Sequence, residues 1–174
     1  MLRGLLHVVR EIRYLSIEPN FELLDAMLHY IDAFSEQFHH HKEEAYLFER
    51  LGARLPAAAS LIDRLKQEHQ SGAVKLRALR DALMHYREAG SSAFPEFSSR
   101  ATDFAAFHWD HMRLEEDELI PLARLHLIGA DWDAIDAAFL GHTDPLLGAE
   151  QGAEYQELFR RIVELAPPPL GKVS

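Results

Sequence analysis

The chain has 174 residues, a formal net charge of −10 at pH 7, 48% hydrophobic residues and no cysteine. This length fits a single domain with its own hydrophobic core, the negative charge disfavours a nucleic-acid partner, and no apolar run approaches the roughly 18 residues that a membrane-spanning helix needs. Without cysteine there is neither a disulfide framework nor a thiolate ligand, so a metal site would have to use imidazole and carboxylate, and we expect a soluble, cytoplasmic protein without a nucleic-acid or membrane partner.

Prolines and glycines divide the chain into segments with helical periodicity and no convincing strand. A first helix is predicted over residues 2–17, ending before Pro19, because proline disfavours helical geometry in the residue that precedes it. Longer helices are predicted over residues 21–51, 56–89 and 95–128, each bounded by proline or glycine. Four helices joined by short loops predict an all-α, up-down-up-down four-helix bundle, whose core is a natural place for a metal site.

Two short helices are predicted beyond the bundle. Asp131 is expected to cap the first of them, and the last spans residues 154–165. We expect one domain over residues 1–166, with its first helix truncated at the N-terminus, followed by a Pro-rich tail over residues 167–174.

Three consecutive histidines lie in the helix predicted over residues 21–51, where its apolar stripe shifts. The upstream stripe points to His41, whereas the downstream stripe carries His40 and Glu44. Such a shift predicts a kink, a bulge or a change of packing partner. We favour His40 because Glu44 follows it by one helical turn, so both side chains project from one face. Glu43 is assigned to the solvated surface.

On the helix predicted over residues 56–89, His69 lies at the centre of the apolar stripe, between Leu65 and Leu76. A ligand in a helical bundle must face the core, so stripe position is the useful criterion. His85 points to the opposite side of the same helix. His69 is therefore a candidate ligand and His85 is not.

The helix predicted over residues 95–128 carries a second His-x-x-x-Glu pair, His111 with Glu115, inside its apolar stripe. Glu118 and His108 lie close to His111 in helical projection, two turns after it and one turn before it. A carboxylate in a core is costly unless it is paired or bound to a cation. Glu115 therefore needs a partner, and a cation would provide one.

A histidine in a helix is more often a surface residue or a hydrogen-bonded core residue than a ligand. This simpler interpretation is preferred for five others, and His39 either supports a ligand by hydrogen bonding or is exposed. The five are His7, His29, His85, His126 and His142.

Three segments, FHHHKEEAYLFERL, LKQEHQSGAVKLRAL and FHWDHMRLEEDELIPLA, resemble the successive metal-binding helices of the hemerythrin-like family of the bacterial type, also called the HHE cation-binding domain. The resemblance implies a four-helix bundle that holds two non-heme irons, bridged by two carboxylates and an oxo or hydroxo group. It implies terminal ligands at His40, His69 and His111 and bridging carboxylates at Glu44 and Glu115. Further candidate ligands are His108, Glu118 and His41.

Members of this family usually supply one more histidine from the first helix, and the stripe of the helix over residues 2–17 places that position a few residues before Met1. We expect that the reading frame starts upstream and adds a histidine there. Otherwise the protein has lost one ligand and binds metal weakly, singly or not at all. His108 could compensate in part.

The resemblance implies a protein that binds dioxygen or a related small diatomic for sensing, storage or delivery, without catalytic turnover. Two iron ions are the expected cofactor, and zinc, manganese or a single metal are alternatives with the same ligand types. An apolar surround would restrict solvent around the metal. It would be formed by Phe34, Phe38, Phe104 and Phe107. The alternative functions are a di-iron oxidase or peroxidase and a metal-poor helical module for protein interaction, and the oligomeric state is left open.

Overall fold

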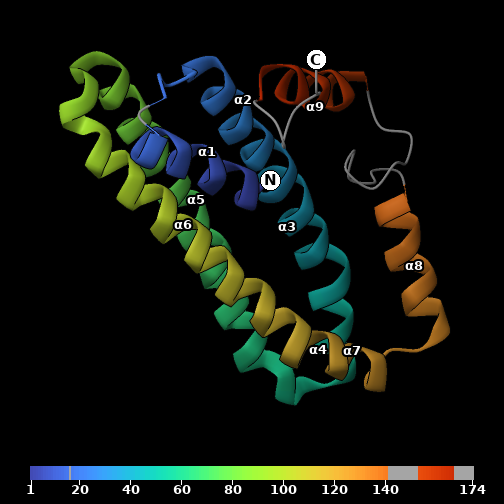
Figure 1. Cartoon of the computed structure of the whole chain (residues 1–174). Helices are drawn as coiled ribbons and strands as arrows, with labels where there is room; N and C mark the ends of the chain where they lie inside the picture. The colour runs from blue at the N-terminus through green and yellow to red at the C-terminus, as the bar shows by residue number, and fades with distance from the viewer. Residues whose placement is uncertain (16, 141–152, 167–174) are drawn as a thin grey trace.

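The computed structural model describes residues 1–15, 17–140 and 153–166, without the side chains of residues 35–38, 140 and 153–156. Every regular element in these ranges is helical, which confirms the all-α prediction for this part of the chain (Figure 1). No helix in the same ranges is both long enough and apolar enough to cross a membrane. The Pro-rich tail predicted over residues 167–174 lies outside the described residues.

The first long segment after α1 (Leu2–Leu15) is helical throughout but alternates between α-helical and π-helical turns. Asn20 begins it, because its side-chain oxygen accepts a hydrogen bond of 3.0 Å from the backbone N–H of Leu23. A π-helical turn holds one residue more than an α-helical turn and so rotates the following side chains about the axis. The predicted kink or bulge at the histidines is therefore confirmed. The segment consists of α2 (Phe21–Ile31), η1 (Asp32–His39), α3 (His40–Lys42), η2 (Glu43–Phe48) and α4 (Glu49–Arg54).

Two further long segments lie side by side over most of their length, α5 (Ala59–Ala89) and α6 (Phe94–Leu114) (Figure 1). Gly90 ends α5 with a φ of 69°, a left-handed conformation that residues with a Cβ rarely adopt. The short turns η3 (Pro56–Ala58) and η4 (Gly90–Ala93) precede the two helices, and α6 continues through the π-helical η5 (Glu115–Leu119) into α7 (Ile120–His126).

The two short C-terminal helices are present as α8 (Gly129–Leu140) and α9 (Ala153–Leu165). Asp131 was expected to cap α8 from the position before the helix, but it lies within the first turn. From there its carboxylate accepts a hydrogen bond of 3.1 Å from the backbone N–H of Ile128 and one of 3.0 Å from Arg54. The α9 helix packs against α2, where Arg161 forms an ion pair of 2.6 Å with Glu22.

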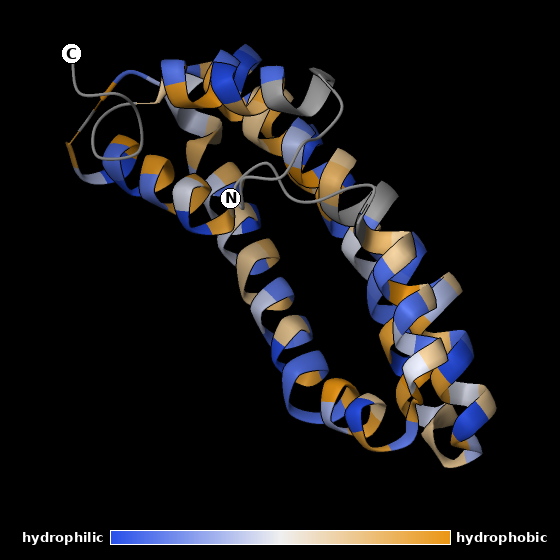
Figure 2. Ribbon diagram, turned by 90° about the vertical axis from the view of Figure 1, so that its right-hand side faces the viewer, coloured by the Kyte–Doolittle hydropathy of each residue, from blue (hydrophilic) through white to orange (hydrophobic). Residues whose placement is uncertain are grey.

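The long helices carry hydrophobic and hydrophilic residues together along their length, as expected for amphipathic helices with one buried face (Figure 2). Their buried residues form two separate apolar clusters. On α5, Leu76 belongs to the first cluster and Leu65 to the second, with His69 between them. On α6, Phe104 belongs to the first and Leu114 to the second. A polar layer therefore lies between the two apolar clusters.

Candidate metal centre

Three buried histidines from three helical elements meet in this polar layer. His40 comes from α3, His69 from α5 and His111 from α6, and their exposed fractions are 7%, 6% and 3%. The ring centroid of His69 lies 3.9 Å from that of His40 and 4.9 Å from that of His111. One ring nitrogen of each residue lies within 4.8 Å of the other two. This spacing allows all three imidazoles to face a common point.

Two carboxylates lie against these imidazoles. Glu43 from η2 is 5% exposed, and its Oε2 lies 3.6 Å from Nε2 of His69. Glu115 begins η5, and its Oε1 lies 3.0 Å from Nε2 of His111 and 4.0 Å from Nε2 of His69. Glu43, His69 and Glu115 form a second group whose ligand atoms lie within 4.8 Å of one another. We refer to the five residues His40, Glu43, His69, His111 and Glu115 as the His–Glu cluster.

Four buried atoms of the His–Glu cluster have no hydrogen-bond partner within the described part of the chain. They are Oε2 of Glu43, Nε2 of His69, Nε2 of His111 and Oε1 of Glu115. The contact of 3.0 Å between His111 and Glu115 is close but lacks hydrogen-bond geometry. Buried polar atoms are nearly always satisfied in folded proteins, so several unsatisfied atoms that converge require an explanation. Nitrogen and oxygen lone pairs directed at one region fit a bound cation.

The outer ring nitrogens of two cluster histidines contact carboxylates. The Nδ1–H of His69 donates to Oε1 of Glu44 at 2.7 Å, and the Nδ1–H of His111 donates to Oε2 of Glu68 at 2.9 Å. Arg64 in turn donates to the other oxygen of Glu68 at 2.9 Å. A carboxylate can only accept, so each contact places a ring proton on Nδ1 and leaves Nε2 as the nitrogen that faces the cluster and could bind a cation once the ring is neutral.

Without a cation, the carboxyl groups of the cluster are in very different protonation states. Burial, reinforced by the charge of Glu115, raises the pKa of Glu43 to about 9. Burial alone would also raise the pKa of Glu115, but the adjacent imidazoles of His111 and His69 outweigh burial and lower that pKa below its usual range. For His111, the nearby Glu115 and Glu68 outweigh burial and raise the pKa. The metal-free cluster thus retains a proton on Glu43 that a cation would displace.

Aromatic rings surround the cluster. Phe48 stacks on His69 with ring centroids 5.6 Å apart, and Phe107 stacks on His111 at 6.5 Å. Of the phenylalanines predicted to surround the site, Phe107 therefore contacts a histidine of the cluster, whereas Phe104 lies 4.2 Å from His108 and Phe34 lies 6.5 Å from His39, two histidines outside the cluster. The side chain of the fourth, Phe38, lies outside the described residues. Such an apolar surround limits access of solvent to a bound metal.

The structure brings together four of the five residues expected as ligands from the sequence, and it places Glu43 rather than Glu44 beside them. His40, His69, His111 and Glu115 converge, whereas Glu44 lies on the outer side of His69 with 37% of its side chain exposed. Glu43 occupies the inner position. Its assignment to the solvated surface is therefore wrong, because the π-helical turns rotate it inward.

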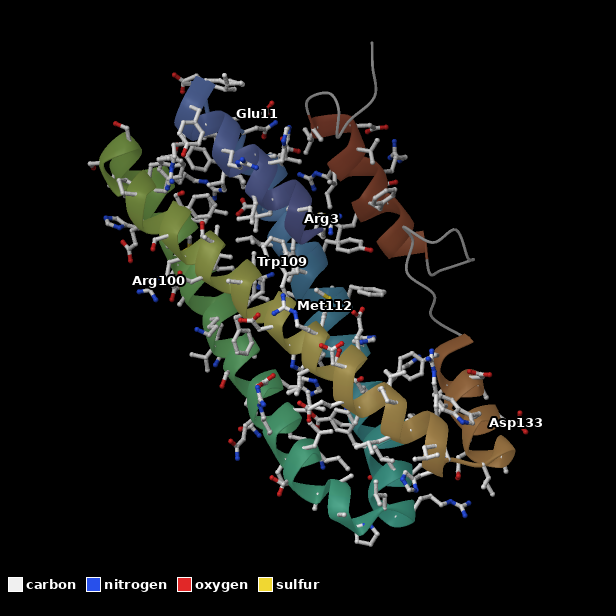
Figure 3. The ribbon with its side chains drawn as sticks, turned by 60° about the horizontal axis from the view of Figure 1, so that its bottom comes forward. Arg3, Glu11, Arg100, Trp109, Met112 and Asp133 are labelled. Carbon is white, nitrogen blue, oxygen red and sulfur yellow. The ribbon has the colours of Figure 1, made fainter. Side chains whose placement is uncertain are left out.

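The three further candidates lie outside the His–Glu cluster. His108 is buried beside it, with Nδ1 donating to the carbonyl oxygen of Phe104 at 3.2 Å and its ring centroid 6.4 Å from that of His40. His41 and Glu118 are exposed. Trp109 and Met112 lie on the exposed face of α6 (Figure 3). The buried histidines His108 and His111 lie on a different face of the same helix.

The sequence analysis did not find Glu43, Glu68 or the contacts of His39. A signal was present, because His39 and Glu43 form another His-x-x-x-Glu pair, shifted by one residue from His40 and Glu44. The structure takes His40 from one pair and Glu43 from the other, because the position of the π-helical turns decides which side chains face inward, and that position cannot be read from spacing alone. His7 on α1 lies 3.4 Å from Glu11 and outside the cluster, and the expected first-helix histidine stays a prediction.

A comparison with protein families identifies one domain in the chain. The family model described as hemerythrin HHE cation binding domain matches residues 1–123. No curated protein and no solved structure gives a significant match. The matched range contains the whole His–Glu cluster and ends within α7, so that α8 and α9 lie beyond it.

Proposed function

Because this chain belongs to the hemerythrin HHE cation-binding domain family, we propose that its His–Glu cluster holds two non-heme irons that bind dioxygen or a related small diatomic. The observation that carries the proposal is the convergence of four buried nitrogen and oxygen atoms that have no hydrogen-bond partner in the described part of the chain. In this proposal α1, the segment over residues 21–54, α5, and the segment over residues 94–126 form an up-down-up-down bundle around the cluster.

The first cation would be held by His40, His69 and His111, each of which places one ring nitrogen within 4.8 Å of the other two. Glu43 and Glu115 flank these imidazoles and each carries a second oxygen, so they would bridge to the second cation. His39 offers a further imidazole beside the cluster, with its ring centroid 5.9 Å from that of His40. Two negative carboxylates shared between two cations offset part of the repulsion between the metal charges.

Imidazole and carboxylate ligands suit iron, manganese and zinc, and the chain offers no thiolate that would select a softer metal. We propose iron as the physiological metal because an oxygen carrier needs a redox-active ion with an open position. When bound, the iron pair would supply the electrons that dioxygen takes up on binding and would recover them when dioxygen leaves. The protein supplies the three imidazoles, the two carboxylates and the aromatic surround that keeps bulk water away.

The proposal favours binding over turnover. A phenylalanine-lined surround admits a diatomic more readily than a larger substrate. The sensing, storage or delivery of dioxygen would therefore fit the site, whereas an oxidase or peroxidase would need a path to the cluster for its reducing substrate.

The test is ferrous loading without oxygen, followed by exposure to oxygen. We expect about two irons per chain and a visible absorption band that appears with oxygen and fades when oxygen is removed. A band that decays when a reducing substrate is added, with formation of product, would replace the carrier by an oxidase or peroxidase. Absence of iron binding, or iron binding without an oxygen-dependent band, would overturn the proposal.

A further inference from the structure

We propose that Glu44 and Glu68 are positioning residues, which hold His69 and His111 so that the Nε2 atom of each ring faces the cation. The inference rests on the proposed function, since it deepens the account of the same site. It gives a role to two glutamates that are not members of the His–Glu cluster.

The two contacts are the same in kind but come from different pairs of elements. Glu44 belongs to η2 and accepts from His69 on α5 at 2.7 Å. Glu68 belongs to α5 and accepts from His111 on α6 at 2.9 Å. Each glutamate therefore reaches across to the neighbouring helix. Both contacts engage the Nδ1 atom of a cluster histidine. A chance pairing of a surface charge would not be expected to occur twice at the same ring nitrogen.

In both contacts the histidine is the buried partner and the glutamate is the more exposed one. The side chains of His69 and His111 are 5% and 4% exposed, whereas those of Glu44 and Glu68 are 37% and 20% exposed. The glutamates thus approach the rings from the solvent side, and the opposite ring nitrogens lie within 4.0 Å of Glu115 inside the cluster. The geometry separates an outer atom that donates a proton from an inner atom that is left to bind metal.

Glu68 is itself held in place. Arg64, one turn earlier on α5, donates to its Oε1 while Oε2 accepts from His111. This chain of contacts runs from an exposed guanidinium to a buried imidazole. It fixes the rotamer of Glu68 and, through it, the orientation of the His111 ring.

The expected consequence follows from the chemistry of histidine ligands. A carboxylate on the outer nitrogen sets the tautomer and ring orientation and makes the inner nitrogen a stronger donor to the metal. Loss of such a partner typically lowers metal affinity about 10- to 100-fold. If Glu44 were instead a direct ligand, the Nδ1–H of His69 would not depend on it.

The experiment uses zinc, which is diamagnetic and does not require oxygen chemistry. The full chain and the variants Glu44→Ala, Glu44→Gln, Glu68→Ala and Glu68→Gln are loaded with zinc, and the affinity is measured by competition with a chelator. The imidazole resonances are assigned by ¹H–¹⁵N NMR. Glu49→Ala is the matched control, since Glu49 is an exposed glutamate in the next turn of the same helical segment.

We expect each alanine variant to bind zinc about 10- to 100-fold more weakly and Glu49→Ala to bind it like the wild type. The Nδ1–H resonance of His69 disappears by exchange in Glu44→Ala, and that of His111 in Glu68→Ala. The glutamine variants keep an acceptor oxygen without the charge, so they retain the resonances at shifted positions and restore part of the affinity.

Three results are distinguishable. If the alanine variants bind zinc as tightly as the wild type and keep both Nδ1–H resonances, the positioning role is overturned while the metal site stands. If zinc binding depends on Glu44 and Glu68 as expected but the iron-loaded protein shows no oxygen-dependent absorption band, the oxygen-carrier proposal is overturned and the positioning role stands. If the wild type binds neither zinc nor iron, both proposals are overturned.

Discussion

Removal of the metal should strongly destabilise this protein, because the His–Glu cluster lies in the core. Four of its buried polar atoms have no hydrogen-bond partner among the described residues. A buried unsatisfied polar atom costs about 1–3 kcal/mol, and because these four atoms also contact one another we take the low end of that range, about 4 kcal/mol for the four together without metal. The whole free energy of unfolding of a domain is only about 5–15 kcal/mol.

The size of the effect can be stated as a melting temperature. For a chain of this length, 1 kcal/mol shifts the midpoint by about 2–4 °C, so a cost of about 4 kcal/mol corresponds to a shift of at least about 8 °C. The same free energy is reached when free metal exceeds its dissociation constant about a thousandfold. Both routes predict a shift that thermal unfolding resolves without difficulty.

The assay is thermal unfolding followed by circular dichroism, for chelator-treated protein and for protein reloaded with zinc or, without oxygen, with ferrous iron. His69→Ala and His85→Ala form a matched pair, since each removes one imidazole from α5, and His85 is exposed and paired with Glu96 at 3.3 Å. The metal-dependent shift should be retained in His85→Ala and largely lost in His69→Ala. Metal-free and metal-loaded protein that melt within about 2 °C of each other, with metal binding verified, would refute the reasoning.

The other predictions concern metal content, pH and access to the site. Loss of an outer hydrogen-bond partner of a ligand lowers metal affinity roughly 10- to 100-fold, and His69→Ala should lower it at least as much because it removes the ligand itself. His85→Ala should retain its metal after dialysis. Equal metal contents of the two variants by elemental analysis would contradict this prediction. In the metal-free protein, the raised pKa of Glu43 means that the folded state keeps a proton that the unfolded state loses, so the contribution of Glu43 to stability is full below about pH 4.5 and declines as pH rises toward about 9. Glu43→Gln should remove this decline from the urea unfolding midpoints, and an unchanged slope would count against the buried position of Glu43. The ring of Phe139 on α8 lies 5.9 Å from the ring of His39 and 5.8 Å from the ammonium of Lys42, beside the His–Glu cluster. If α8 covers the site there, Phe139→Ala should leave the metal content intact but let a chelator extract the metal several-fold faster. An unchanged extraction rate would show that α8 does not cover the site.

The helices themselves were predictable from the sequence because their apolar stripes are long and their ends carry proline or glycine. The prediction placed the α5 segment at residues 56–89, and η3 and α5 together occupy the same range. The buried positions of His69, His111 and Glu115 were also predictable, since His69 lies at the centre of its apolar stripe and the other two lie within theirs. On regular helices the 3.6-residue period is enough to tell an inward side chain from an outward one.

Where a helix departs from that period, the sequence pattern was not enough to predict which side chains face inward. The π-helical turns over residues 32–39 and 43–48 change the angular position of every residue that follows. The shift of the apolar stripe predicted a kink, a bulge or a change of packing partner but not the residue at which it lay, so Glu44 was preferred over Glu43. The contact of Glu68 with His111 depends on the distance between two helices, which no pattern within one helix contains.

Anomalous diffraction from crystals of iron-loaded protein tests the central claim most directly. We predict two adjacent anomalous peaks in the polar layer between the apolar clusters, each within coordination distance of imidazole nitrogens and carboxylate oxygens. The ligating side chains should be those of the His–Glu cluster. Iron found only at surface carboxylates, or no peak near His40, His69 and His111, would contradict the account.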